Sequence, residues 1–138
     1  IQPQHAMDDR DVIARFWGTP AGIPYAFNRL HKAGTKLLMG SDAPVAPLDP
    51  WMAISAAVFG TESSDREPFQ PEQCLDFETA LASSTAVGRV ALRDADAADL
   101  VLLDCDPSII DSPEAMRAMP EHVLGTMLAG RWTYQQAE

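Results

Sequence analysis

The chain has 138 residues, the size of one ordinary domain, and 46% of them are hydrophobic while 22% are charged. These proportions are typical of a globular chain and argue against disorder. The formal net charge of −10 disfavours binding to nucleic acid or to anionic membrane surfaces, and no apolar run approaches the ~20 residues that a membrane span needs.

Two further features concern the compartment and the completeness of the chain. Cys74 and Cys105 lie in different segments and form no Cys-x-x-Cys pair, so we expect two reduced thiols in a cytoplasmic protein. The sequence starts at Ile1 without a Met and shows no signal-peptide pattern. We therefore expect it to be part of a longer polypeptide.

The first half of the chain predicts helices and strands in alternation. Residues 1–3 are compatible with the end of a strand, and residues 25–33 predict a helix that ends at Gly34, a good left-handed cap. Residues 35–39 form a short apolar run closed by Gly40, which is typical of a buried strand. A helix followed directly by a buried strand indicates a parallel α/β unit.

Two more helices and then a β-rich region complete the predicted elements. Asp49 and Asp76 are suited to cap helices, the second of which would run to about Ser84. Residues 100–103 predict a strand, and residues 106–120 predict a loop with about one helical turn. Runs at 123–128 and 131–134 flank the tight turn Ala129-Gly130 and so predict a hairpin.

The segment Gly40-Ser41-Asp42 is the first candidate for chemistry. It follows the predicted strand at residues 35–39, and functional groups gather at the carboxyl ends of parallel strands. A carboxylate there can bind a metal ion and accept a proton. Ser and Asp are also common in turns, so the local pattern leaves both interpretations open. A phosphate site is disfavoured because Asp42 would face the anion.

Two runs, in this order, carry a resemblance that covers nearly the whole chain: Gly40-Ser41-Asp42-Ala43-Pro44-Val45 and Ala98-Asp99-Leu100-Val101-Leu102-Leu103-Asp104. Shorter matches accompany them, namely Gln2-Pro3-Gln4-His5, Asp49-Pro50, Ser84-Thr85, Asp106-Pro107 and Gly130-Arg131-Trp132-Thr133-Tyr134. This order resembles the C-terminal portion of the metal-dependent amidohydrolase superfamily, in particular the amidohydrolase 3 branch that includes the N-substituted formamide deformylases.

The resemblance implies an α/β fold that is the last part of a (β/α)8 TIM-type barrel, followed by strands of a small β-sandwich. Residues 1–85 would supply the last β/α units of the barrel, and residues 86–138 would supply the sandwich strands. Asp42 matches the family's aspartate after the eighth strand, which is a metal ligand and a proton shuttle. His5 matches the mouth of the seventh strand and would contact substrate, although a hydrogen-bonded structural histidine is an equal alternative.

The implied activity is metal-dependent hydrolysis of carbon–nitrogen bonds other than peptide bonds, in small amides or formamides. The implied cofactor is a divalent metal, zinc in the first instance. Only three histidines are present, His5, His31 and His122, and no His-x-His pair is among them. A catalytic zinc site has three or more protein ligands, so we expect the metal site of this chain to be incomplete.

An incomplete barrel would also affect the partners of the chain. A strand at residues 35–39 would lack a neighbour, so the chain would pair with the remainder of the barrel or self-associate. The alternative to an enzyme is a non-catalytic α/β module that acts only by packing against a partner. We expect no nucleic-acid partner and no membrane partner.

Overall fold

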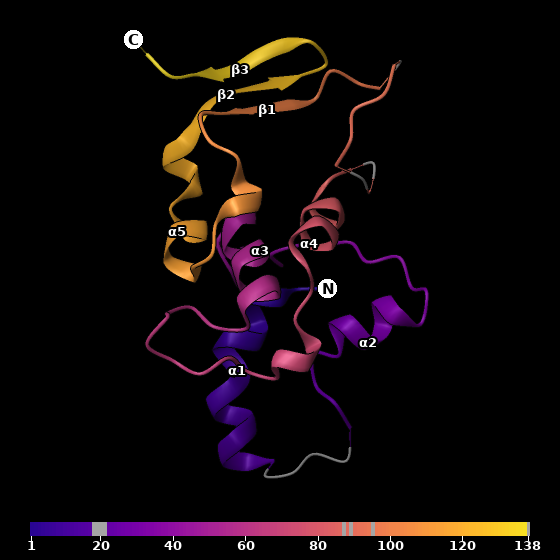
Figure 1. Cartoon of the computed structure of the whole chain (residues 1–138), viewed down its shortest axis with the longest axis vertical. Coiled ribbons are helices and arrows are strands. Elements are labelled where there is room, and N and C mark those ends of the chain that lie inside the picture. The colour runs from indigo at the N-terminus through magenta and orange to yellow at the C-terminus, as the bar shows by residue number, and fades with distance from the viewer. Residues whose placement is uncertain (18–21, 87, 89, 95, 138) are drawn as a thin grey trace.

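The computed structural model of the chain describes residues 1–17, 22–86, 88, 90–94 and 96–137. Helices are the main regular elements, and an antiparallel sheet lies at the end of the molecule away from the C-terminal end of the first helix (Figure 1). The elements in chain order are α1 (Pro3–Phe16), α2 (Phe27–Lys32), α3 (Pro50–Phe59), η1 (Pro71–Gln73), α4 (Phe77–Ser84), β1 (Leu100–Leu103), η2 (Pro107–Ile109), α5 (Pro113–Arg117), η3 (Met119–His122), β2 (Val123–Leu128) and β3 (Arg131–Gln135).

This arrangement confirms a mixed α/β chain. A closed barrel is not visible in the described part of the chain, where the strands form a small antiparallel sheet, so the barrel stays a proposal. The described residues include no helix of the length and apolarity needed to cross a membrane.

Helix α1 departs from the sequence prediction, which placed the end of a strand at residues 1–3. The helix instead begins at Pro3, whose fixed φ suits a first helical turn and whose missing N–H is not needed there. The apolar residues that α1 buries are few, and this narrow stripe gives a weak helical pattern in the sequence. They are Ala6, Met7 and Ile13.

Helix α2 is shorter than predicted at its start. Tyr25 has a φ of 55°, which is outside the right-handed helical region, so the helix begins only at Phe27. Its end agrees with the prediction, because Gly34 has a φ of 84° and occupies the left-handed position that follows many helices.

The predicted caps of α3 and α4 are confirmed. The carboxylate of Asp49 accepts a hydrogen bond from the Trp51 N–H at 2.9 Å, and that of Asp76 accepts one from the Thr79 N–H at 2.8 Å. Each bond satisfies a donor that has no partner inside its own helix.

The prediction of a strand at residues 35–39 is wrong for the described chain, but two backbone bonds show what the pattern reflects. The Ile1 nitrogen donates to the Leu38 carbonyl at 2.8 Å, and the Gly40 N–H donates to the Ile1 carbonyl at 3.0 Å. Bonds that flank Met39 in this way follow the pairing pattern of parallel neighbours. The ladder does not continue because α1 starts at Pro3.

The core lies between the helices, with α3 in contact with α1, α4 and α5. The side chains packed there are mostly small or flexible, which lets the short helices approach closely. The most deeply buried of them are Ile54, Ala57, Ala80, Met116 and Met119.

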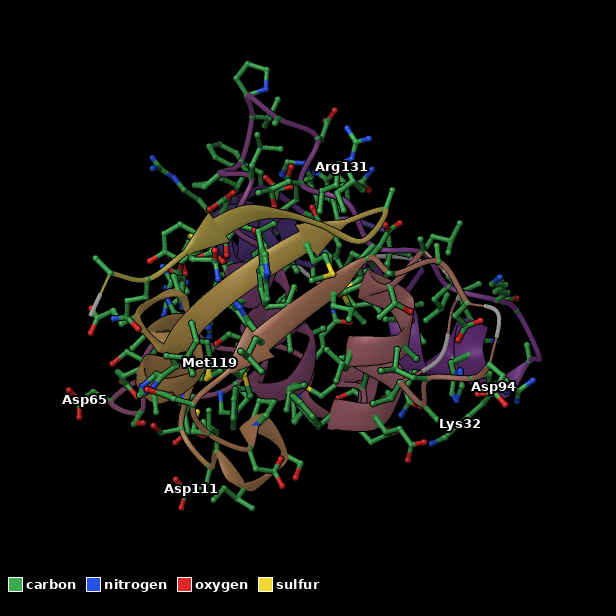
Figure 2. The ribbon with its side chains drawn as sticks, turned by 90° about the horizontal axis from the view of Figure 1, so that it is seen from above. Lys32, Asp65, Asp94, Asp111, Met119 and Arg131 are labelled. Carbon is green, nitrogen blue, oxygen red and sulfur yellow. The ribbon has the colours of Figure 1, made fainter. Side chains whose placement is uncertain are left out.

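The sheet has the order β1-β2-β3 with both pairs antiparallel, and it lies across the helices when seen from above (Figure 2). The predicted hairpin of β2 and β3 is confirmed. Ala129 and Gly130 have φ values of 49° and 76°, as the tightest hairpin turns require. All of β3 is exposed, so the sheet presents much of its surface to solvent.

Candidate functional site

Asp42 forms a turn and also presents a carboxylate. Its φ of 55° lies in the left-handed region, which Asp tolerates better than most residues. The turn is closed through the backbone, since the Val45 N–H donates to the Asp42 carbonyl at 2.9 Å. The side chain is 62% exposed and reaches His5 instead of closing the turn. The turn and the candidate chemistry are therefore compatible.

His5 lies in the first turn of α1 and faces two carboxylates. Its Nε2 is 3.6 Å from Asp42 Oδ2, and its Nδ1 is 3.9 Å from Asp8 Oδ2. Both separations are longer than a hydrogen bond and become ion pairs when the ring is protonated. With a side chain only 20% exposed, His5 is held between the carboxylates, whereas Asp42 is open to solvent.

The structure thus brings together the two residues that the sequence nominated separately. The bonds between Ile1 and residues 38–40 place the start of α1 beside the segment that carries Asp42. These contacts determine the approach of His5 to Asp42. The roles of ligand and substrate contact stay predictions.

Gln4, next to His5, connects α1 to the loop that follows α3. Its buried amide nitrogen donates to Glu62 Oε1 at 3.0 Å, and Glu62 is also 3.3 Å from the Arg117 guanidinium. The amide oxygen of Gln4 is buried and has no hydrogen-bond partner in the described chain. Buried amide oxygens are normally hydrogen-bonded, so the position next to this oxygen, beside the candidate site, is suited to a polar group.

The Asp42 carboxylate fits one ligand position of a zinc site, and the His5 imidazole lies beside it. Carboxylate oxygen and imidazole nitrogen are both zinc ligands, and two such atoms on one tetrahedral ion lie roughly 3.3 Å apart, close to the 3.6 Å found here. Within the described residues, no third His, Cys, Asp or Glu joins these two in a compact group. Asp42 therefore fits one position of a metal site that the described residues do not complete.

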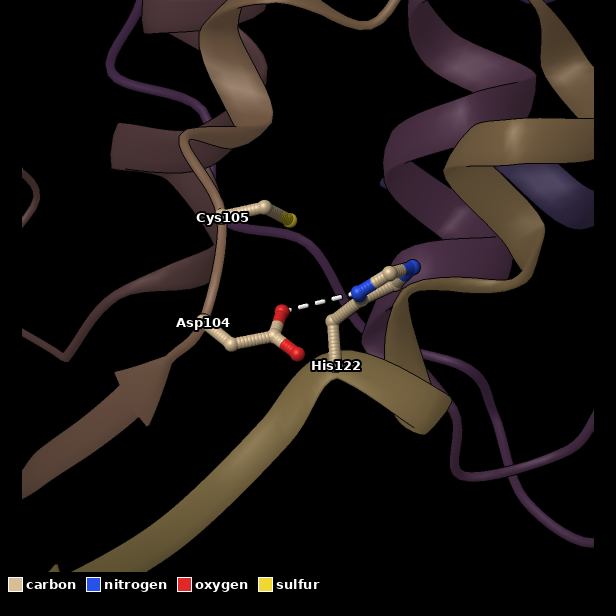
Figure 3. A group of neighbouring side chains, drawn as sticks. All are labelled: Asp104, Cys105 and His122. Atoms are coloured by element: carbon tan, nitrogen blue, oxygen red, sulfur yellow. Dashed lines mark hydrogen bonds and ion pairs between the residues drawn. The ribbon is translucent and has the colours of Figure 1, made fainter.

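A second polar group was not foreseen from the sequence, which predicted a reduced thiol at Cys105 and gave His122 no role. The donor atoms of Asp104, Cys105 and His122 lie within 4.8 Å of one another (Figure 3). His122 Nδ1 donates to Asp104 Oδ1 at 2.8 Å. Only the pairing of β1 with β2, which sets Leu103 opposite Val123, could have revealed this group. Both cysteines are free, as expected.

Away from the candidate site, the pKa values of several side chains are shifted by burial and by hydrogen bonds. Hydrogen bonds from the Ser64 N–H and hydroxyl lower the pKa of Glu114 to about 2. Burial, together with a hydrogen bond from its hydroxyl to Asp9, raises the pKa of Tyr25. A hydrogen bond from the Thr79 N–H lowers the pKa of Asp76. These groups join the loops and helices around the core.

In a comparison with known proteins, residues 1–134 match the model of the amidohydrolase family. The chain is also similar to Protein LONG AFTER FAR-RED 3 of Arabidopsis thaliana, with 28% identity over 145 residues that cover 97% of this chain. The same alignment covers 24% of the Arabidopsis protein, so the chain spans about a quarter of that relative's length. No solved structure matches the chain.

Proposed function

The chain belongs to the amidohydrolase family, and on this basis we propose that it supplies part of the active site of a hydrolase for carbon–nitrogen bonds other than peptide bonds. The substrates in this proposal are small amides or formamides, as in the N-substituted formamide deformylase branch. The observation that supports it is the 3.6 Å approach of His5 Nε2 to Asp42 Oδ2.

In this proposal Asp42 holds a divalent metal, zinc in the first instance, and moves a proton. When bound, such an ion polarises a carbonyl and lowers the pKa of a water molecule. The exposed carboxylate of Asp42 accepts a proton from water and passes it to the leaving nitrogen. The remaining metal ligands come from outside these 138 residues.

His5 contacts the substrate in this proposal. Its Nδ1 faces Asp8 while its Nε2 faces Asp42, so the ring orientation is set on both sides. A ring nitrogen held beside the reacting carboxylate is placed to hydrogen-bond the amide or formamide group. His5 thereby orients the substrate toward Asp42.

The wider fold of this proposal is a (β/α)8 barrel, with residues 1–85 as its last units and residues 86–138 as strands of a small β-sandwich. The parallel bonding pattern around Met39 supports it, because neighbouring barrel strands are parallel. The position of Asp42 just after this segment supports it too, since active sites of such barrels lie at the carboxyl ends of the strands.

Substitution of Asp42 tests the proposal. In the intact protein, Asp42→Asn should lower turnover of an N-substituted formamide or amide substrate by about 10²–10⁴-fold, because the amide cannot accept a proton. His5→Gln should lower kcat/KM by about tenfold, the loss of one hydrogen bond in the transition state. The measurement is steady-state hydrolysis followed by amine release.

Asp65→Asn is the matched control, since Asp65 is also exposed and acidic but lies in the loop after α3. It should leave turnover within about twofold of the wild type, as surface substitutions away from a site have small effects. An Asp42→Asn protein as active as the Asp65→Asn protein would contradict the role of Asp42.

A further inference from the structure

The second polar group, which we call the Asp104 cluster, consists of Asp104, Cys105 and His122 (Figure 3). Asp104 and Cys105 directly follow β1, and His122 ends η3 immediately before β2. The proposed hydrolysis uses none of these three residues. Their donor atoms are a carboxylate oxygen, a thiol sulfur and an imidazole nitrogen, all within 4.8 Å of one another.

The backbone holds the two halves of the cluster together. Leu103 is paired with Val123 in the sheet, and the Asp104 N–H donates to the His122 carbonyl at 3.1 Å. The cluster therefore lies at the end of the paired strands β1 and β2, which hold its two halves side by side. Sites supported by regular elements keep their side chains closer to one geometry than loop sites do.

The three donor atoms lie within 4.8 Å of one another, so small movements would bring them to the separations that one tetrahedral ion imposes. Zinc binds sulfur at about 2.3 Å and nitrogen or oxygen at about 2.0–2.2 Å, so its ligands lie roughly 3.3–3.6 Å apart. The 2.8 Å bond between His122 and Asp104 would open by roughly half an ångström as the ion replaces the shared proton. We propose that the Asp104 cluster binds a zinc-class divalent transition-metal ion, with a fourth position open to solvent.

The surroundings of the cluster separate a closed side from an open side. Cys105 Sγ is 3.7 Å from the sulfur of Met119, which is fully buried. The side chains of Asp104 and His122 are 46% and 44% exposed. An ion thus enters from the carboxylate and imidazole side and finds the sulfur against the core. A thiol ligand favours zinc-class ions over magnesium or calcium.

The protons balance on binding. The thiol of Cys105 loses its proton to solvent. The proton that His122 Nδ1 shares with Asp104 is exchanged through solvent for one on Nε2, so that Nδ1 of the imidazole can bind the ion. The carboxylate of Asp104 binds as the anion. Binding should therefore weaken as pH falls, as for other sites built from thiolate and imidazole.

Cobalt(II) is the probe, because a thiolate bound to cobalt gives a near-ultraviolet charge-transfer absorption that carboxylate and imidazole do not give. We expect about one equivalent of Co²⁺ to produce this band in the wild-type protein and Zn²⁺ to displace it. Cys105→Ser should abolish the band, while the matched control Cys74→Ser should keep it. Asp42→Asn should also keep it, which separates this site from the proposed hydrolytic site.

Two further measurements protect the test against a variant that does not fold. His122→Gln should lower Zn²⁺ affinity by about tenfold or more in competition with a chromophoric chelator. In the unmodified protein, saturating Zn²⁺ should slow alkylation of Cys105, located by mass spectrometry, without slowing that of Cys74. A folded wild-type protein without the band, a band that survives in Cys105→Ser, or equal alkylation with and without Zn²⁺ would overturn the proposal.

Discussion

At the scale of single residues, the candidate site is defined by the 3.6 Å between His5 Nε2 and Asp42 Oδ2. This approach depends on backbone bonds between Ile1 and residues 38–40, so the local patterns that nominate the two residues do not show that they are neighbours. The Asp104 cluster shows the same limit more strongly. Asp104 and His122 become neighbours only through the register of β1 with β2, and local pattern does not specify register between distant strands.

Glu114 should make stability depend on pH in the acid range. Its pKa is lowered from 4.5 to about 2 in the folded chain by hydrogen bonds from Ser64. The unfolded chain therefore binds the proton more readily, so the stabilisation is complete above about pH 4.5 and is lost as pH falls toward 2. Glu114→Gln should flatten this part of the profile. Urea midpoints at pH 7, 4 and 3 measure the effect.

The control for Glu114 is Glu67→Gln, which removes another exposed carboxylate from the segment that contains Ser64. This variant should keep the decline of the urea midpoint between pH 4 and pH 3. If the Glu114→Gln and Glu67→Gln proteins show the same decline, the bonds from Ser64 do not stabilise the folded chain.

At the scale of elements, the sequence predicted best where a local device fixes a boundary. The capping carboxylates of α3 and α4, the glycine after α2 and the two-residue turn of the hairpin each act within a few residues, and each is confirmed. The predictions of a strand end at residues 1–3 and of a strand at residues 35–39 were wrong, because the structure of these segments depends on tertiary neighbours. An apolar run becomes a strand only where a partner of similar length lies beside it, and Ile1 alone provides too little.

The cap of α4 gives a prediction at this scale. Asp76→Ala should lower the free energy of unfolding by about 1 kcal/mol, because the Thr79 N–H loses its acceptor. Asp76→Asn should retain most of that stability, since an amide oxygen can accept the same bond. Urea unfolding with an unchanged m-value measures the difference. An alanine variant as stable as the asparagine variant would show that the cap contributes nothing.

At the scale of the whole molecule, the helices share one core, whereas much of the sheet surface is exposed to solvent. In the described residues β1 and β3 are the edge strands of the sheet, and several large apolar side chains on it are about half exposed or more. They are Val101, Leu102, Leu128, Trp132 and Tyr134. This surface is also the observation that favours the alternative of a packing module, since exposed sheet edges pair readily with other chains.

We expect the isolated 138-residue chain to self-associate. Sedimentation velocity between about 5 and 100 µM should show a sedimentation coefficient that rises with concentration, because edge pairing and apolar burial both favour association. Val101→Lys should reduce the association, since a lysine on an edge strand opposes pairing. A single well-folded monomer at every concentration would contradict both the incomplete barrel and the packing module.

The bonds between Ile1 and residues 38–40 also bear on the order of folding. They join the two ends of a segment of about 40 residues, and closing such a loop carries an entropic cost of roughly 3 kcal/mol. The capped helices form from contacts near in sequence, whereas the pairing of His5 with Asp42 requires that long loop to close. The site thus depends on a non-local closure, and we expect catalysis to report on that tertiary closure where helix content does not.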